Sequence, residues 1–418
     1  TWWQVLEDPL LTSLVERATS DNLGLKEARA RLQEARALRG ISQAGFWPEL
    51  EVSAAATRSR SSTNNGTGQV KNLYSAGFDA SWELDVFGGV RREIEAAQAT
   101  LEAAEANLHD LQVSLPAEVA LNYLEVRTYQ TRVSYAVAMV QNQQEAYSLF
   151  HSLYVSGLVT ELAMQESLQL LSELQAEVPD LETALEAARN RLAVLLGKSP
   201  GTLHHELGTI QPLPDLPPRF AAGIPAETLR RRPDVRHSER QLAAQTARIG
   251  IAVADLYPRF RLSGLMGLEA VNSNDLLQTS SQVWRLGPSL SWKIFNAGAI
   301  RQNIAVQNAL QEQALANYER MVLEALEDVE NALLAYAKEQ AKHEALTNAV
   351  AAAQRSSDLA ADQYRSGLIN YKHVLDAQRS LFGLQDRLCR SSGTRAANIV
   401  RLYKALGGGW EVPSSDPI

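Results

Sequence analysis

The sequence has little of what disulfide-rich, metal-binding and helical membrane proteins require. Its single cysteine, Cys389, excludes an intramolecular disulfide framework and any metal site built on two or four cysteines. No apolar run approaches about 18 residues, so no transmembrane helix is expected. Acidic side chains outnumber basic ones by 48 to 40, which argues against a nucleic-acid partner. Composition alone describes a large, soluble, helical protein with length for two or three domains.

Motifs of the common enzyme classes are also missing. The sequence contains no nucleophile elbow, phosphate-binding loop, zinc-protease motif or dinucleotide fingerprint. His204 and His205 are adjacent, but neighbours in sequence point apart and no third ligand is evident. We therefore expect neither an enzyme nor a bound metal or cofactor.

What the sequence does contain is an internal repeat. Trp47-Pro48 is matched by Tyr257-Pro258, 210 residues later, and Ser81-Trp82 is matched by Ser291-Trp292 at the same offset. Chance matches would not keep one register over such a distance, so we predict a tandem duplication. The expected parts are a first repeat at 1–205, a proline-rich extended connector at 206–225, a second repeat at 226–410 and a tail at 411–418.

Each repeat is expected to contain a helix, a β-hairpin, a long helix, a tight turn and a returning helix. The first helix, over about 12–45, ends before a proline. Apolar and polar residues then alternate from Phe78 to Val86 and from Trp284 to Ile294, which predicts strands with one apolar face. Weaker runs from Leu50 and Phe260, followed by polar loops at 59–72 and 272–282, complete two hairpins.

Long helices follow the hairpins in both repeats. In the first of them, apolar residues from Ile94 to Leu115 follow one another at alternating steps of three and four, a heptad seam suited to coiled-coil packing. The strict repeat breaks beside Pro116. At 1.5 Å per residue, some 65 residues would span roughly 100 Å. The expected elements are hairpins at 48–86 and 258–295, long helices at 88–154 and 298–364, and returning helices at 158–197 and 368–406.

Four amphipathic strands per chain leave sheet edges open unless the sheet closes. The strand lengths fit a membrane crossing, and known bacterial barrels begin at eight strands, so the pattern favours oligomerisation. Two chains would give eight strands and a filled interior, whereas three would give twelve and room for a pore. The alternative from the pattern alone is an ordinary small sheet. Aromatic residues cluster at or near the strand ends, as in an interfacial girdle: Trp47, Tyr74, Trp82, Tyr257, Trp284 and Trp292.

A series of short motifs, in order and over essentially the whole chain, resembles the outer membrane factor family of the TolC and OprM type, including NodT-like ducts. These motifs are Trp2-Trp3, Asp8-Pro9, Trp47-Pro48, Trp82-Glu-Leu-Asp85-Val-Phe87-Gly88, Arg232-Pro233-Asp234-Val235, Tyr257-Pro258, Trp292-Lys-Ile-Phe295-Asn-Ala-Gly298 and Leu375-Asp376-Ala377-Gln378-Arg379. Each motif is weakly specific alone, but their order and spacing together are specific.

The resemblance implies a mostly α-helical fold with β-strands. Three protomers would form a twelve-stranded transmembrane β-barrel in the bacterial outer membrane, continuous with a periplasmic α-helical barrel. The implied function is the passive outer membrane channel of a tripartite efflux pump, exporting drugs or other small toxic compounds. Its implied partners are a periplasmic adaptor, an inner membrane transporter of RND type and outer membrane lipid. Similar members are commonly lipoproteins, and the anchoring cysteine is then either absent or just upstream of Thr1.

The resemblance also assigns candidate sites. The helical turns would contact the adaptor through Ser156, Gly157, Leu158, Ser366, Gly367 and Leu368. Asp376 and Arg379 match the acidic and basic positions of a periplasmic gate, and a threefold carboxylate ring favours cations. Lys372 and His373 depart from the family pattern. Tyr364 matches a tyrosine at the tip that bonds across helices to hold the closed state, and the alternative for Tyr364 is core packing. The alternative is a plain surface ion pair between Asp376 and Arg379, three residues apart on one helix.

Two rival functions remain open from the sequence. A soluble coiled-coil scaffold would pack the faces of Trp82 and Trp292 inside the protein. A type I protein-secretion duct would share the architecture and differ in its transporter.

Overall fold

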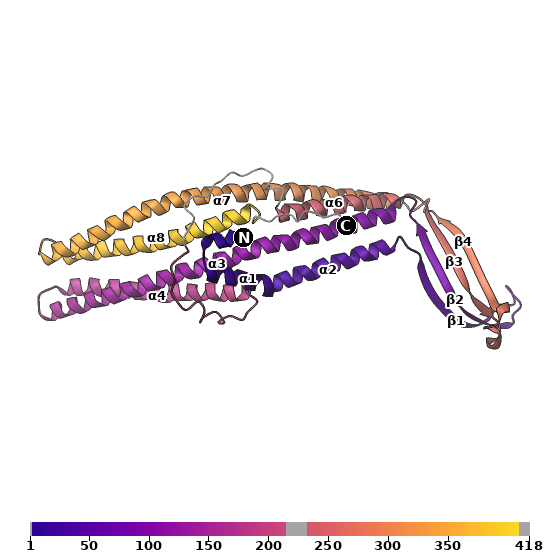
Figure 1. Ribbon diagram of the computed structural model, residues 1–418, viewed down its shortest axis with the longest axis horizontal. Coiled ribbons are helices and arrows are strands. Elements are labelled where there is room, and N and C mark those ends of the chain that lie inside the picture. Colours follow the sequence, from indigo (N-terminus) through magenta and orange to yellow (C-terminus); the bar gives the residue numbers. More distant parts are fainter. Residues whose placement is uncertain (1, 215–231, 409–418) are drawn as a thin grey trace. The chain divides into compact units, whose positions relative to one another are not determined.

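The computed structural model describes residues 2–214 and 232–408 (Figure 1). Thr1, the connector beyond Pro214, the first residues of the second repeat (226–231) and the tail at 411–418 lie outside the described residues. The principal elements in chain order are α1 (Pro9–Asp21), α2 (Leu23–Ala44), β1 (Glu49–Arg60), β2 (Val70–Leu84), α3 (Gly89–Val155), α4 (Glu161–Leu195), α6 (Pro233–Ala254), β3 (Arg259–Ala270), β4 (Gln282–Ser291), α7 (Ala299–Arg365) and α8 (Tyr371–Ala405). A 3-10 helix at Trp2–Leu6 precedes α1, and two short ones, Ser273–Asp275 and Thr279–Ser281, lie between β3 and β4.

The amino-terminal helical region is two helices rather than the one expected over 12–45. The Asp8 carboxylate caps α1 by accepting from the backbone N–H groups of Leu10 and Leu11. Asn22 interrupts the helix with an extended ψ of 130°. Its side-chain oxygen accepts from the Leu25 N–H at 3.1 Å, while its amide donates to the Leu195 carbonyl oxygen at 2.8 Å. A local side-chain bond of this kind competes with the helix, so the break falls at the asparagine.

The long helices α3 and α7 have 67 residues each, and the returning helices α4 and α8 have 35 each. The long helices begin and end within one residue of the expected 88–154 and 298–364. Pro116 lies inside α3 and Pro179 inside α4, and neither ends its helix. The mostly helical fold class with four strands is therefore confirmed.

No helix within 2–214 and 232–408 is both long enough and apolar enough to cross a membrane.

The four strands form one antiparallel sheet in the order β1-β2-β3-β4. β2 begins at Val70, inside the loop expected at 59–72. Lys71 and Asn72 dilute the apolar pattern of its first half, but this half is a strand because it pairs fully with β1. β4 ends at Ser291, so Trp292 and Ile294 follow the strand instead of belonging to it.

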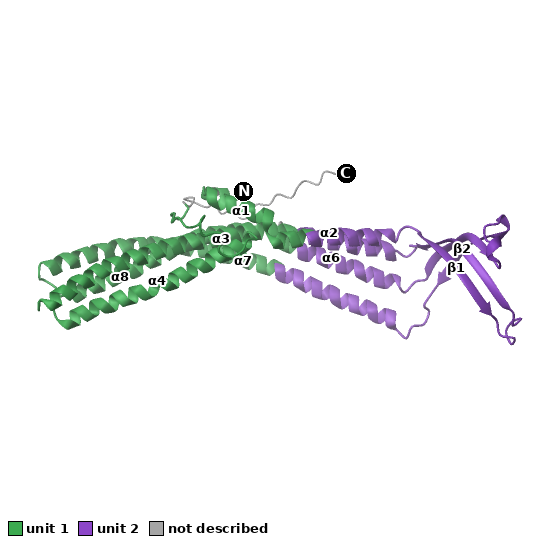
Figure 2. Cartoon of the chain, turned by 90° about the horizontal axis from the view of Figure 1, so that it is seen from below, with its two compact units in different colours: residues 1–29, 107–235, 322–418 green, residues 30–106, 236–321 purple. Residues whose placement is uncertain are grey.

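The chain divides into two compact units, and neither unit is a sequence repeat (Figure 2). Unit 1 comprises 1–29, 107–235 and 322–418, and unit 2 comprises 30–106 and 236–321, so each unit takes segments from both repeats. Unit 1 has a core of fully buried side chains that includes Leu11, Leu14, Val119, Tyr123 and Leu192. Unit 2 contains the whole sheet, and its buried helical positions are mainly alanines, including Ala96, Ala99, Ala103, Ala244 and Ala247.

Candidate functional site

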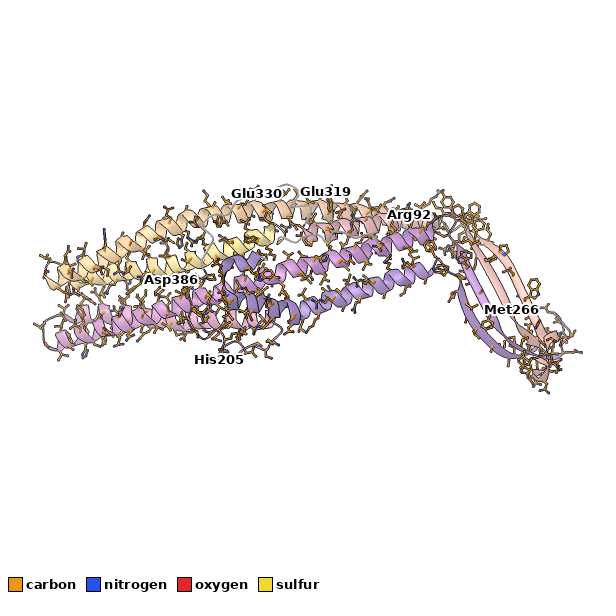
Figure 3. The ribbon with its side chains drawn as sticks, viewed as in Figure 1. Arg92, His205, Met266, Glu319, Glu330 and Asp386 are labelled. Carbon is orange, nitrogen blue, oxygen red and sulfur yellow. The ribbon has the colours of Figure 1, made fainter. Side chains whose placement is uncertain are left out.

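The sheet in unit 2 has one face that is apolar from edge to edge. The register places Val52, Phe78, Met266 and Trp284 in one row across the four strands. Their exposed fractions are 71%, 53%, 72% and 78%, and Met266 extends freely from β3 (Figure 3). Other members of this face are Leu50, Ala54, Ala76, Ala80, Gly264, Leu268, Leu286 and Leu290. An exposed apolar face of this continuity marks an interaction surface.

The opposite face is mostly polar. One of its rows runs Glu51, Asp79, Leu265 and Arg285 across the strands. Ser53 Oγ donates to the Asp79 carboxylate at 2.7 Å on the same face. A sheet with one apolar and one polar face separates two different surroundings.

β1 and β4 are the two edges of this sheet. Among the described residues, neither edge strand has a second neighbour in the sheet. Unpaired backbone N–H and C=O groups along an edge are a template for pairing with another chain.

The candidate interfacial aromatics fall into two groups. Trp47 and Tyr257 precede β1 and β3 by two residues, Trp82 is near the end of β2, and Trp292 directly follows β4. Tyr74 and Trp284 are nearer the opposite, loop end of the sheet. Their membrane role stays a prediction.

Two of these tryptophans make equivalent hydrogen bonds in the two repeats. The Trp82 indole N–H donates to the Phe46 carbonyl oxygen at 3.0 Å, and the Trp292 indole N–H donates to the Leu256 carbonyl oxygen at 3.0 Å. Each bond fastens the end of a hairpin to the end of the preceding helix. The repeated bond preserves the helix-to-strand connection in both copies.

The turns between the long and returning helices share one backbone conformation. Gly157 has φ +71° and Gly367 has φ +73°, the left-handed region that favours glycine. The Gly157 N–H donates to the Tyr154 carbonyl oxygen at 2.9 Å, and the Gly367 N–H donates to the Tyr364 carbonyl oxygen at 2.9 Å. Ser156 and Ser366 each donate a backbone bond of 3.1 Å to the residue four positions earlier.

The side chains around these two turns differ in chemistry. At the first turn Val155, Leu158 and Leu162 are 73%, 73% and 67% exposed. At the second, Leu368 is 74% exposed, while the counterparts of Val155 and Leu162 are the basic Arg365 and Lys372. The first turn therefore exposes three apolar side chains. The second exposes Leu368 and two basic side chains, of which Arg365 is paired with the Asp362 carboxylate at 2.8 Å.

Of the five candidate gate residues, Asp376 and His373 lie together. Both line an open groove between α7 and α8, to which α7 contributes Arg355, Gln363 and several alanines. Asp376, His373 and Lys372 are all exposed in the chain. The groove thus gathers one carboxylate, one imidazole and one guanidinium.

Arg379 does not pair with Asp376, so the simple ion pair considered from the sequence is wrong. Its guanidinium contacts the Glu173 carboxylate on α4 at 2.9 Å. The Gln169 amide and then Arg379 lower the pKa of Glu173. Arg379 therefore ties α8 to the hairpin of the first repeat and leaves Asp376 open to the groove.

Tyr364 belongs to an aromatic cluster that the sequence did not reveal in full. Phe150 on α3 and Tyr371 on α8 have ring centroids 3.7 Å apart, and Tyr364 lies 5.3 Å from Tyr371. Burial, followed by the neighbouring Tyr364 hydroxyl, raises the pKa of Tyr371 to about 12. Phe150, Tyr371 and Glu173 were missed because their partners come from helices whose neighbours the sequence does not give.

A buried arginine fixes the beginning of the connector. Arg127 is 1% exposed, and its guanidinium donates to the Thr209 carbonyl oxygen at 2.9 Å and to the Gln211 side-chain oxygen at 3.0 Å. It also donates to the Tyr123 hydroxyl and the Gln130 side-chain oxygen. These four bonds satisfy most of its donors inside the protein.

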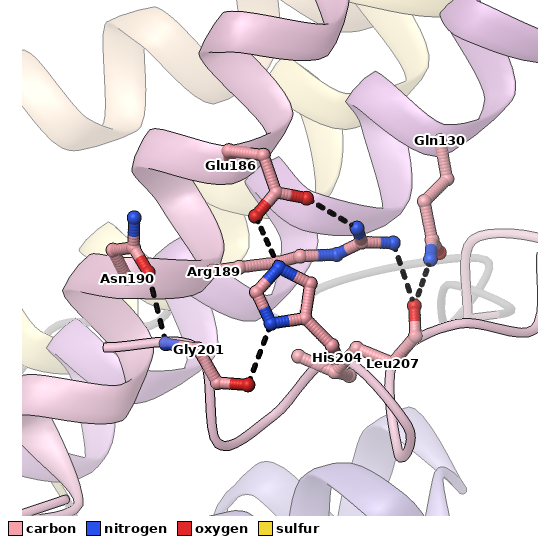
Figure 4. Close-up of polar contacts among 7 residues, drawn as sticks. All are labelled: Gln130, Glu186, Arg189, Asn190, Gly201, His204 and Leu207. Carbon is pink, nitrogen blue, oxygen red and sulfur yellow. Dashed lines mark hydrogen bonds and ion pairs between the residues drawn. The ribbon is translucent and has the colours of Figure 1, made fainter. Parts of the chain in front are cut away.

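His204 belongs to a polar cluster whose hydrogen bonds join the segment after α4 to that helix (Figure 4). One ring nitrogen bonds to the Gly201 carbonyl oxygen and the other to the Glu186 carboxylate, both at 2.6 Å. The Gly201 carbonyl and then Glu186 raise the pKa of His204, because both acceptors favour the doubly protonated ring. Within the described part of the chain, no three His, Cys, Asp or Glu side chains are placed to hold a metal ion.

A profile of the family described as "Outer membrane efflux protein" matches the chain twice, at residues 14–198 and 224–408. The two matches are offset by the same 210 residues as the internal repeat. Together they cover most of the chain.

Individual relatives match over nearly the full length. "Nodulation protein T" of Rhizobium leguminosarum bv. trifolii is 31% identical over 98% of this chain and 88% of its own length. "Toluene efflux pump outer membrane protein TtgF" of Pseudomonas putida is 31% identical over 100% of this chain and 87% of its own. Among solved structures, the outer-membrane channel OprN is 38% identical with a TM-score of 0.94, covering 98% of this chain and 92% of that one.

Proposed function

This chain belongs to the outer membrane efflux protein family, and we propose that three copies of it assemble into the exit duct of a tripartite efflux pump. Each copy contributes four strands to a twelve-stranded barrel in the outer membrane and two helical hairpins to a periplasmic tunnel. The duct is passive, since an inner membrane transporter would supply the energy.

The observation that carries this proposal is the sheet with one apolar face and two open edges. In lipid, covering each large side chain of the Val52, Phe78, Met266 and Trp284 row contributes about 1.5–3 kcal/mol relative to water. In water the same face would favour aggregation, and the edges would stay unpaired. A soluble scaffold would need the strand face to be inside, whereas Trp284 is 78% exposed.

The assembly is tested by extracting the chain from membranes with a mild detergent and measuring the protein mass of the particle. Three copies per particle and ion conductance after insertion into a planar lipid bilayer support the duct. A monodisperse single copy that stays in solution without detergent contradicts it.

We propose further that the two turns receive a periplasmic adaptor that is coupled to a transporter of RND type. The apolar side chains exposed at the first turn, and the exposed Lys372 near the second, support an adaptor surface with apolar and acidic side chains. Val155→Asp should reduce co-purification of the adaptor from the native cell envelope. Val137→Asp, the same change at an exposed position further back on α3, is the control and should not. Equal recovery with both variants would contradict the assignment of the turn.

The exported compounds are proposed to be small and apolar or amphipathic. The support is similarity to a toluene efflux protein. Cells lacking the chain should accumulate a fluorescent dye or lose solvent tolerance, and the restored gene should reverse this. If restoration reinstated only secretion of a protein, the type I duct would be the better assignment.

The gate is proposed to be formed by Asp376 from three copies. Asp376 is exposed and leaves Arg379 to Glu173, so its carboxylate is available to the lumen when the hairpins surround an axis. Three carboxylates around one axis repel one another and attract cations. His373 and Lys372 would moderate this charge, while Tyr364 and Tyr371 hold the α7–α8 turn against α3.

Ion selectivity tests the gate. Asp376→Asn should lower the cation-to-anion permeability ratio measured from reversal potentials in a salt gradient. Glu166→Gln, at the equivalent position of the first repeat, is the matched control and should leave the ratio unchanged. An unchanged ratio in Asp376→Asn would remove Asp376 from the conduction path.

A further inference from the structure

The apolar face of the sheet ends in two arginines on β1. From Leu50 to Ala56 every second residue of this strand is apolar, and the same alternation then places Arg58 and Arg60 on that face. Both arginines are exposed. Arg58 is opposite Asn72 of β2, so the polar boundary of the face crosses both strands. The apolar face of the first hairpin therefore ends in cationic side chains at its loop end.

The second repeat has no charge at the equivalent positions. Moving Arg58 and Arg60 by 210 residues gives Leu268 and Ala270 of β3, which are both apolar. A charged side chain on the lipid-facing surface of a barrel is destabilising at the middle of the membrane and is tolerated near the headgroups. If lipid covers this face, the two arginines therefore mark the level of the headgroups.

The length of β1 agrees with this level. The strand rises about 3.4 Å per residue, so the nine steps from Glu49 to Arg58 cover roughly 31 Å along it. A strand tilt of about 40° reduces this length to roughly 23 Å across the membrane. The apolar band of a bacterial barrel is about 25 Å tall. The arginines thus lie where such a band would end.

Both guanidinium groups have N–H groups to spare. Arg60 Nε donates to the Gly68 carbonyl oxygen at 2.9 Å, and this bond leaves its terminal nitrogens available. Among the residues that the structure describes, neither Arg58 nor Arg60 pairs with a carboxylate. Glu269, an acidic residue at the same end of the sheet, belongs to the polar face. A guanidinium group without a carboxylate partner is free to bind an external anion, and its fork of N–H groups fits the oxygens of a phosphate in pairs.

The loop between β1 and β2 is polar but carries no charge. Residues 61–69 are serine, threonine, asparagine, glutamine and glycine only, and nearly all of them are exposed. Hydroxyl and amide groups of this kind donate hydrogen bonds to anionic oxygens. The loop therefore adds neutral donors beside the arginines and no carboxylate that would repel an anion.

We propose that Arg58 and Arg60 bind the phosphate groups of a phosphorylated lipid in the outer leaflet of the outer membrane. The inference rests on the proposed duct, in which the apolar face meets lipid and the loop end of the sheet faces the exterior. The ligand is a lipid headgroup rather than a free phosphate ion, because the arginines continue the apolar face. Acyl chains lie against the apolar rows, and the phosphate reaches the arginines at the end of these rows.

Lipid binding by the purified particle tests the proposal. The probe is bisphosphorylated lipid A, titrated in detergent micelles and counted per chain by native mass spectrometry. Arg58→Gln with Arg60→Gln should weaken its binding by roughly 25-fold, since each arginine near an anionic lipid surface contributes roughly a fivefold gain. Lys71→Gln is the matched control, because Lys71 is exposed at the same level but on the polar face, opposite Ser59. This variant should bind the probe as the wild type does.

Two further probes identify the part of the lipid that is recognised. Lipid A without its two phosphates should bind the wild type no better than bisphosphorylated lipid A binds the double variant. Because this comparison uses the wild type, it does not depend on how the variants fold. Inorganic phosphate at the concentration of the lipid should not displace lipid A.

The proposal is overturned by equal binding to the wild type and the double variant, by an equal loss in Lys71→Gln, or by equal binding of the two forms of lipid A. Displacement by inorganic phosphate would replace the lipid with a free anion. A wild-type particle of one copy would contradict the duct itself. A conducting particle of three copies with unchanged lipid binding in the double variant would contradict only the lipid site, so the two failures are distinguishable.

Discussion

The hairpin α3–α4 of the first repeat and the hairpin α7–α8 of the second have the same backbone but different surfaces. Their helices have equal lengths, and their turns share the glycine conformation and the hydrogen bonds. On the returning helices, Leu162, Ala163 and Glu166 of the first repeat correspond to Lys372, His373 and Asp376 of the second. The same backbone therefore carries different side chains at these positions, and in the second hairpin His373 and Asp376 add charge to the groove.

The same contrast appears in the middle of the long helices. Arg127 on α3 binds the beginning of the connector, while its equivalent on α7 is Ala337. The connector follows the first repeat, and the side chain that binds its beginning is Arg127. The duplicated scaffold has therefore diverged where the two copies have different neighbours.

Of the substitutions that compare the two repeats, the removal of the Arg127 side chain should lower the free energy of unfolding most. Arg127→Ala leaves several buried acceptors without a donor and should lower the free energy of unfolding by about 3 kcal/mol. Urea unfolding in detergent, followed by circular dichroism, measures it. Lys338→Ala, at an exposed site next to Ala337, should cost less than about 0.5 kcal/mol. A similar loss of unfolding free energy in both variants would mean that residues other than Arg127 fix the connector.

Substitution by alanine of the two glycines that follow the returning helices should lower the thermal midpoint by unequal amounts. Gly197 and Gly407 have φ +68° and +81°, so alanine strains the backbone at both by about 1–2 kcal/mol. At Gly197 a Cβ would also lie 2.8 Å from the Asp21 carbonyl oxygen, whereas at Gly407 the nearest atom is 3.7 Å away. Gly197→Ala should therefore lower the thermal midpoint more than Gly407→Ala. The reverse order would show that the two ends relax differently from this geometry.

Substitution by phenylalanine of the two tryptophans at the hairpin ends should lower the stability by equal amounts. Trp82→Phe and Trp292→Phe each remove one indole hydrogen bond to a carbonyl oxygen and should cost about 1 kcal/mol. Thermal unfolding of the two variants in the same detergent checks this. A clear difference between them would mean that one hairpin end is held by contacts that the other lacks.

The smallest effect should be the pH dependence at His204. Its raised pKa means that protonation stabilises the fold fully below the unfolded value near 6.5, and this stabilisation is lost as pH rises through the folded pKa. The thermal midpoint of the wild type should exceed that of His204→Gln at acidic pH, and the gap should shrink as pH rises. His205→Gln is the control. A gap that widened with pH would contradict the sign.

The repeat made much of the fold predictable. The offset between Trp47-Pro48 and Tyr257-Pro258 let the pattern of each half support that of the other, and the long helices lie within one residue of the expected 88–154 and 298–364. The first half of β2 was missed because Lys71 and Asn72 interrupt its pattern, although pairing with β1 keeps it extended. The break at Asn22 depends on a bond to Leu195, far away in the sequence.

The candidate site was predictable only in part. Asp376 was recognisable from its motif, and the turn glycines from their place between helices. The partner of Arg379 was not, because Glu173 lies on a helix of the other repeat and no spacing rule connects them. Contacts between repeats depend on packing, which the sequence pattern of one repeat does not contain.

We propose that the second hairpin, and not the first, closes the duct. Single-channel recordings in planar lipid bilayers test it by comparing Asp376→Ala with Glu166→Ala. Asp376→Ala should raise the resting conductance, while Glu166→Ala should leave it unchanged. An unchanged conductance in Asp376→Ala, or an equal rise in both variants, would contradict the claim.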